Sequence, residues 1–100
     1  PGAPAAVTLQ LSATDNQFST NQFTVPAGAQ VVIEFVNNDA VPHNFALFES
    51  SALENEIFVG DTITGPGESI TYEFTAPDTP GDYYFLCTVH PFMNGTFTVE

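Results

Sequence analysis

Hydrophobic and polar residues alternate along much of the chain, with the two-residue period of a β-strand that buries one face. The alternation is clear over residues 7–12 and cleanest over 69–75, and residues 31–36 form a β-branched and aromatic run. The side chains of that run that we expect to face the core are Val31, Ile33 and Phe35. Strands with one apolar face predict a core enclosed between two sheets.

Turns rich in glycine and proline, such as 77–81, separate these strands at the spacing of a β-sandwich. Residues 57–59 predict a short edge strand. Ser51 and Glu54 have the spacing of a helix-capping box, so we expect at most one short helical turn, within residues 50–55. The fold predicted is therefore all-β: a Greek-key antiparallel β-sandwich of seven to eight strands.

The length of 100 residues predicts one domain, which we place at 6–100. Residues 1–5 are rich in proline and alanine, which is typical of a linker or of the remnant of a tether. A single cysteine cannot form an internal disulfide. No apolar run approaches the ~20 residues of a membrane-spanning helix, and no signal peptide is recognisable.

The charge is one-sided, because twelve Asp and Glu face no Lys or Arg, for a formal net charge of −12. Nucleic-acid binding is excluded, since no side chain can neutralise phosphate. Such a charge favours encounter with cationic partners. The apolar content of 43% argues against a disordered chain.

Candidate chemistry is concentrated in one short segment near the C-terminus. Cys87, His90 and Met93 are the only cysteine, one of two histidines and the only methionine, and they lie within seven residues. Two imidazoles and a thiolate with a weak axial thioether are the ligands of an electron-transfer copper site. His43 is the only other histidine and must supply the second imidazole.

The segment from Cys87 to Met93 resembles the ligand loop of the cupredoxins, the blue copper proteins. Its C-x2-H-x2-M spacing is most similar to amicyanin and pseudoazurin, and residues 18–28, 31–38 and 42–44 resemble the first half of plastocyanin. The resemblance covers nearly the whole chain. It implies a type 1 copper protein that shuttles one electron between redox partners.

The family pattern also implies a role for each ligand. Cys87 would be the thiolate, His43 and His90 the equatorial imidazoles, and Met93 the axial thioether. The carbonyl of Pro42 would lie on the opposite axial side.

Around these ligands, the resemblance implies that the Asn44 side chain ties the His43 loop to the backbone near Thr88. Val89 stands where amicyanin has proline, so its N–H could donate to the Cys87 sulfur. Leu86 replaces the tyrosine that precedes the copper cysteine in plastocyanin, which puts a lateral electron route through that position in doubt.

The resemblance implies that the edge of His90 reaches the surface within an apolar ring. The candidates for this ring are Pro91, Phe92, Ala40 and Val41. The candidates for an acidic docking patch are Glu49, Glu54, Glu56 and Asp61. The alternative for these four is an evenly solvated acidic surface. We expect a monomer that docks redox proteins with a basic face, cytochromes for example.

Three classes of function compete on the sequence alone. An electron carrier needs one copper, whereas a nitrite reductase or multicopper oxidase needs further histidines for a second centre. Both histidines are already assigned, so this domain alone is not an enzyme, although a type 1 domain of a larger copper enzyme stays open. A metal-free adhesive sandwich is disfavoured by the ligand set. We expect a periplasmic or other extracytoplasmic location. The composition of residues 1–5 is compatible with a membrane tether through a segment that precedes them.

Overall fold

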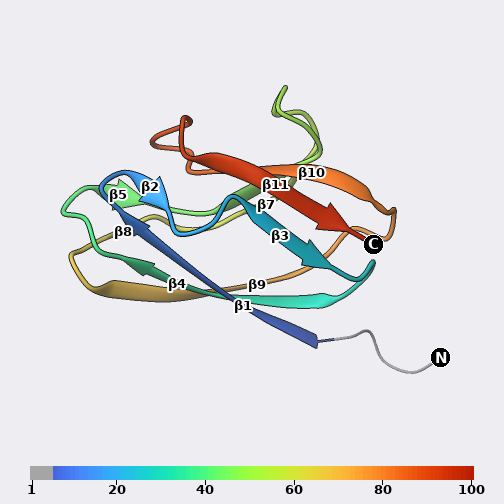
Figure 1. Ribbon diagram of the computed structural model, residues 1–100, viewed down its shortest axis with the longest axis horizontal. Coiled ribbons are helices and arrows are strands. Elements are labelled where there is room, and N and C mark those ends of the chain that lie inside the picture. Colours follow the sequence, from blue (N-terminus) through green and yellow to red (C-terminus); the bar gives the residue numbers. More distant parts are fainter. Residues whose placement is uncertain (1–5) are drawn as a thin grey trace.

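The strands of the computed structural model, which describes residues 6–100, form two main sheets packed face to face (Figure 1). The first sheet has the order β2-β1-β4-β9. Its strands are β1 (Ala6–Thr14), β2 (Gln17–Phe18), β4 (Gln30–Asn37) and β9 (Glu68–Thr75). The predicted β-sandwich is thereby confirmed.

The second sheet has the order β3-β11-β10-β6-β7. Its strands are β3 (Gln22–Val25), β6 (Ala46–Phe48), β7 (Glu56–Val59), β10 (Gly81–Leu86) and β11 (Asn94–Val99). A separate short pair joins β5 (Pro42–His43) to β8 (Ile63–Thr64). The expected edge strand at 57–59 corresponds to β7, which ends the order of this sheet.

Two of the hydrogen-bonded strand pairs run parallel, whereas the sequence predicted an antiparallel sandwich. β1 pairs with β4 and β3 pairs with β11 in parallel, while the other pairs are antiparallel. After β1 and β2 the chain crosses to the second sheet as β3 and returns beside β1 as β4 (Figure 1). An even number of reversals separates β1 from β4, so the two strands point the same way.

Residues 50–55, where at most one short helical turn was expected, form a hydrogen-bonded turn and no helix. Leu53 and Asn55 have φ angles of 58° and 53°, in the left-handed region that a right-handed helix does not contain. Residues 6–100 contain no helix, and therefore none that could cross a membrane. Of the strands in this range, β2, β5 and β8 have two residues each, and the remaining eight match the predicted number.

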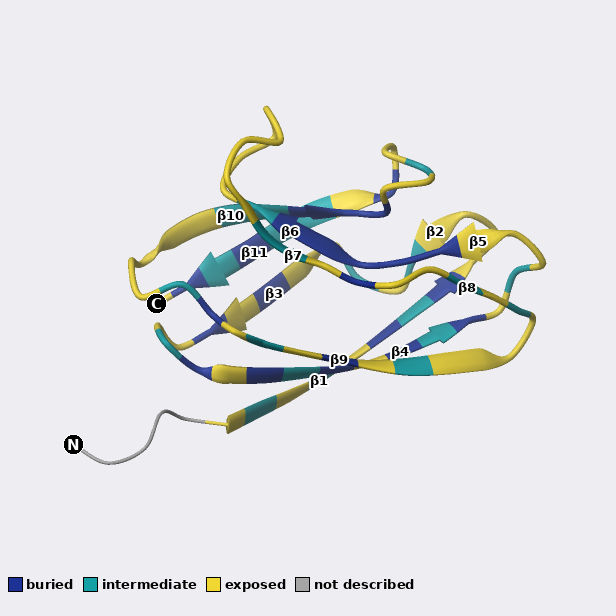
Figure 2. Ribbon diagram, turned by 180° about the vertical axis from the view of Figure 1, so that it is seen from behind, coloured by how far each residue is buried: buried dark blue, intermediate teal, exposed yellow. Residues whose placement is uncertain are grey.

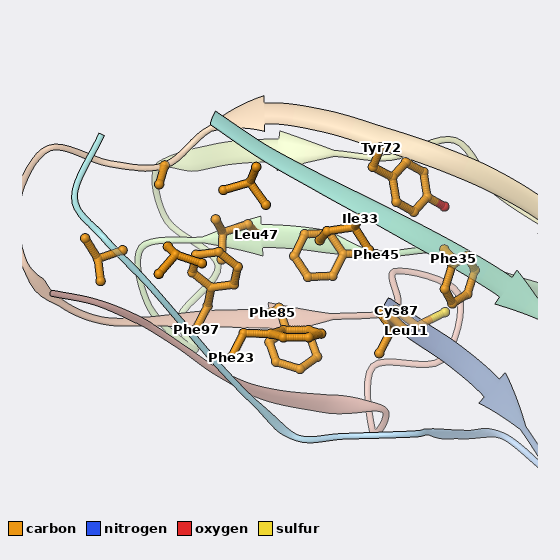
Figure 3. Packing of buried hydrophobic residues seen from close by; sticks show 14 of the residues in the cluster. Leu11, Phe23, Ile33, Phe35, Phe45, Leu47, Tyr72, Phe85, Cys87 and Phe97 are labelled. Atoms are coloured by element: carbon orange, nitrogen blue, oxygen red, sulfur yellow. The ribbon is translucent and has the colours of Figure 1, made fainter. Parts of the chain in front are cut away.

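The buried residues lie between the two sheets (Figure 2), and phenylalanine is the most frequent residue type among them (Figure 3). Val31, Ile33 and Phe35 are 1%, 0% and 0% exposed, which confirms the expected inward face of β4. Phe45 and Phe85 pack with ring centroids 5.5 Å apart. Burying each phenylalanine contributes about 2–3 kcal/mol, so the sandwich is a rigid support for the loops at its ends.

One end of this core carries the candidate chemistry. Cys87 follows directly after β10 and belongs to the same buried core cluster as Leu11 and Phe35 (Figure 3). His43 ends β5, at the same end of the molecule. The linker expected at residues 1–5 lies outside the described residues.

Candidate metal centre

His43 is held by a short strand pair and by a buried asparagine behind it. Its backbone position pairs with Ile63 across β5 and β8, and its side chain is 0% exposed. The Asn37 amide donates to the carbonyls of Val41 and Ile63, both at 2.8 Å, and accepts the Asp39 N–H at 2.8 Å. Asn37 therefore fixes both sides of the loop that delivers His43.

The loop from Cys87 to Met93 is closed by its own backbone. The Cys87 N–H donates to the Met93 carbonyl at 2.9 Å, and the Met93 N–H donates to the His90 carbonyl at 2.9 Å. Cys87 and Met93 are 0% and 3% exposed, so a thiol and a thioether are buried at the two ends of one tight loop. Cys87 forms no disulfide.

The donor atoms of three side chains converge at this point. The Cys87 sulfur lies 3.8 Å from Nδ1 of His43 and 3.9 Å from Nδ1 of His90. One donor atom from each residue lies within 4.8 Å of the other two. In zinc sites, the metal bonds are about 2.3 Å long to sulfur and about 2.0 Å long to nitrogen. If two such bonds meet at about 120°, the sulfur and the nitrogen lie about 3.7 Å apart. The three side chains therefore fit around a single ion.

Asp39 contacts the far side of the His43 ring. Its Oδ2 lies 2.8 Å from His43 Nε2. The backbone N–H groups of Asn16 and Asp15 also donate to this carboxylate, and together with His43 they hold the pKa of Asp39 below its ordinary value. Asp39 is therefore a carboxylate at neutral pH and can only accept hydrogen bonds.

Asn44 links the two ligand segments to a third loop. Its Oδ1 accepts the Thr88 N–H at 2.8 Å and the Thr88 hydroxyl at 3.2 Å, and its Nδ2 donates to the Gly60 carbonyl at 2.9 Å. The side chain is 1% exposed. The contact with Thr88 is the one that the resemblance implied, and its effect on a bound metal stays a prediction.

Two other predicted contacts have less support from the geometry. Among residues 6–100, the structure shows no hydrogen bond from the Val89 N–H to the Cys87 sulfur. Pro42 lies next to His43 in β5. The influence of Val89 and of the Pro42 carbonyl stays a prediction.

The residues predicted to form an apolar ring at His90 are exposed, and Phe92 lies beside the His90 ring. Phe92 is 67% exposed and Val41 is 40% exposed, and the rings of His90 and Phe92 have centroids 5.9 Å apart. Ala40 and Pro91 are also exposed, and His90 itself is half-buried.

The predicted acidic patch (Glu49, Glu54, Glu56 and Asp61) is exposed throughout. Glu49 and Glu54 face each other across the loop between β6 and β7, where the Glu49 N–H donates to the Glu54 carbonyl at 3.3 Å. Glu56 starts β7 and Asp61 follows it. The loop projects from the sandwich (Figure 1).

Sequence reasoning missed Asp39. The one signal was its place four residues before His43, beside two asparagines. Its contacts with Asp15 and Asn16, more than twenty residues earlier, have no counterpart in sequence spacing.

A family model described as a cupredoxin-like domain matches residues 2–99. The chain belongs to this family. The Cys87, His43 and His90 donor set, with Met93 buried beside it, fits the one copper ion of a cupredoxin, and these four residues would hold that ion.

Individual cupredoxins are similar over most of the chain. Amicyanin-alpha of Methylorubrum extorquens is 31% identical over 98% of this chain and 76% of its own length. Plastocyanin of Scenedesmus fuscus is 34% identical over 94% of this chain and 99% of its own. The structure of auracyanin A from Chloroflexus aurantiacus, described as a "blue" copper protein, superposes with a TM-score of 0.81 at 26% identity, covering 96% of this chain and 100% of that one.

Proposed function

We propose that this cupredoxin is a one-electron carrier and not an enzyme. The observation that carries the proposal is the convergence of Cys87, His43 and His90 within 4.8 Å, beside the buried Met93. When bound there, copper supplies a Cu(II)/Cu(I) couple that takes up and releases one electron.

The residues of the chain contribute a fixed and dry donor set. Cys87, Met93 and His43 are buried, and their loops are closed by backbone hydrogen bonds and by Asn44. A donor set that does not rearrange suits both oxidation states with little movement. His90 is half-buried at the surface, which gives an electron a short way in and out.

A catalytic role would need a second metal centre. Both histidines of the chain belong to the site described, so the chain has no imidazole left for another copper. The chain by itself therefore offers an electron-transfer site alone, whether it acts free or within a longer polypeptide.

Copper binding is tested by adding Cu(II) to the metal-free protein and recording visible and EPR spectra. We expect one equivalent of copper and an intense thiolate-to-copper charge-transfer band, because Cys87 supplies the thiolate. Cys87→Ser should abolish the band, while Zn(II) should occupy the wild-type site without colour. A band that survives in the serine variant would show that the ligand assignment is wrong.

We propose that the partners are redox proteins with a basic docking face, and that they approach the apolar surface around His90. Support comes from the exposed Phe92 and Val41, and from an acidic excess that outweighs the charge of one copper ion. Electron transfer with a basic cytochrome should slow as salt rises, because screening weakens long-range attraction. Reaction with an anionic reagent such as ferricyanide should quicken.

Stopped-flow rates can separate a local docking patch from net charge. Neutralising the acidic patch to amides should flatten the salt dependence more than neutralising a control set of equal charge. The control set lies on strands and turns remote from His90 and consists of Glu73, Asp78, Asp82 and Glu100. Equal effects of the two sets would leave only net charge, and rates indifferent to salt would refute electrostatic steering.

We propose further that the protein works outside the cytoplasm, as a monomer. Fractionation of the source cells with a specific antiserum tests the location, and light scattering of the purified protein tests the monomer.

A further inference from the structure

The two ring nitrogens of His43 face different groups. Nδ1 lies 3.8 Å from the Cys87 sulfur, on the metal side, and Nε2 lies 2.8 Å from Oδ2 of Asp39. The ring is 0% exposed, so water does not compete for either nitrogen. The orientation of His43 is therefore set by these two neighbours.

Asp39 is itself held from the opposite side by a tight turn. Asp15 and Asn16 connect β1 to β2 with φ angles of 54° and 57°, the left-handed conformation of a type I′ hairpin turn. Their two N–H groups donate to Asp39, from Asp15 to Oδ1 at 2.8 Å and from Asn16 to Oδ2 at 3.0 Å. The carboxylate thus bridges the β1–β2 turn and His43.

These contacts determine which nitrogen of His43 carries a proton. A carboxylate accepts hydrogen bonds and donates none, so His43 Nε2 must be the donor. In a neutral imidazole the other nitrogen then has a free lone pair, which is the atom that faces the Cys87 sulfur. A carboxylate behind a ligating histidine also raises the basicity of the ring.

We propose that Asp39 is the positioning residue of the buried ligand His43, and that its negative charge favours Cu(II) over Cu(I). The effect on copper rests on the proposed function, whereas the effect on His43 does not need a metal. The Cu(II) site carries one more positive charge than the Cu(I) site, so a negative charge behind the ring stabilises Cu(II) more. Loss of that charge should therefore change the Cu(II)/Cu(I) preference about tenfold.

Asp39→Asn is the most informative change because it removes the charge and keeps one oxygen. With that oxygen in the place of Oδ2, the amide still accepts from His43 and Asn16. Its NH2 group then faces the Asp15 N–H. Both groups are donors, so the hydrogen bond from Asp15 is lost. The variant should keep the His43 orientation and disturb only the charge and the Asp15 amide.

The experiment compares wild type, Asp39→Asn, Asp39→Ala and a control, Asp78→Asn. Like Asp39→Asn, the control removes one negative charge, but from an exposed loop. In Asp39→Asn we expect the reduction potential to rise by about 59 mV, the equivalent of the tenfold preference for one electron. Hydrogen exchange of the Asp15 amide should quicken about tenfold while that of Asn16 does not. Asp78→Asn should change neither.

A second readout uses the metal-free protein, where ¹⁵N chemical shifts of the imidazole report the tautomer. We expect His43 to be protonated at Nε2 in wild type and Asp39→Asn, and to lose this single tautomer in Asp39→Ala. An unchanged tautomer in Asp39→Ala, or equal potentials in Asp39→Asn and Asp78→Asn, would overturn the proposal. If wild type bound no copper the proposed function would fail, yet the tautomer would still decide the positioning role.

Discussion

Asn44 offers the sharpest test of how the fold supports the site. Asn44→Ala removes one hydrogen bond to the Gly60 carbonyl and two from Thr88, all made by a side chain that is 1% exposed. Each bond contributes about 1 kcal/mol, and an unpaired buried carbonyl at Gly60 adds to the loss. We expect the free energy of unfolding to fall by about 3 kcal/mol.

In a domain of this length, that loss lowers the melting temperature by roughly 12–24 °C. Urea unfolding and thermal melts of the metal-free protein measure it without a contribution from copper. The site itself should also loosen, with copper affinity lower by about 10–100-fold, as when other groups behind metal ligands are removed.

Two control variants separate the brace from a general effect of replacing a polar residue. Asn38→Ala removes one exposed hydrogen bond to Thr14 and should cost less than about 0.5 kcal/mol. Thr88→Val removes the hydroxyl and keeps the Thr88 N–H that Asn44 accepts, so most of the stability should remain. If Asn44→Ala were no more costly than Asn38→Ala, the side chain would be a turn residue and the brace would be refuted.

Two further predictions concern the response of the metal-free protein to pH and salt. Burial raises the pKa of Tyr72 above its ordinary value of about 10. Above about pH 10, Tyr72 therefore loses its phenol proton in the unfolded chain and keeps it in the folded protein. The free energy of unfolding then falls as the pH rises. Tyr72→Phe should flatten this alkaline loss between pH 9 and 11, measured by urea midpoints, and equal slopes would contradict the reasoning. The carboxylates repel one another because no Lys or Arg offsets their charge. Raising the salt concentration from about 0.01 to about 0.15 M should screen this repulsion and raise the melting temperature. A falling melting temperature would show that attraction between opposite charges dominates.

The ligands could be predicted from sequence because their residue types are rare in this chain. One cysteine, one methionine and two histidines leave no competing assignment for a soft, mixed sulfur and nitrogen site. The strands were predictable for a different reason, since alternation reports which side chains face the core.

The hydrogen-bond partners of the ligands were harder to predict because they depend on where the backbone goes. Asp39 meets His43 within its own loop, but the two N–H groups that hold it belong to a turn at Asp15 and Asn16. No periodicity links these positions. The left-handed Leu53 likewise shows how a local capping pattern can be overridden by the closure of a loop between two strands.

The two imidazoles of the site are supported very unequally, and this asymmetry fits electron exchange at a surface. His43 is fully buried and contacts Asp39 through its second nitrogen. Among residues 6–100, Nε2 of His90 has no hydrogen-bond partner, and its ring neighbour is the exposed Phe92. A partner that approaches His90 therefore displaces solvent from apolar side chains and breaks no internal hydrogen bond, while His43, Asn44 and the closed Cys87 to Met93 loop keep the donor atoms in place.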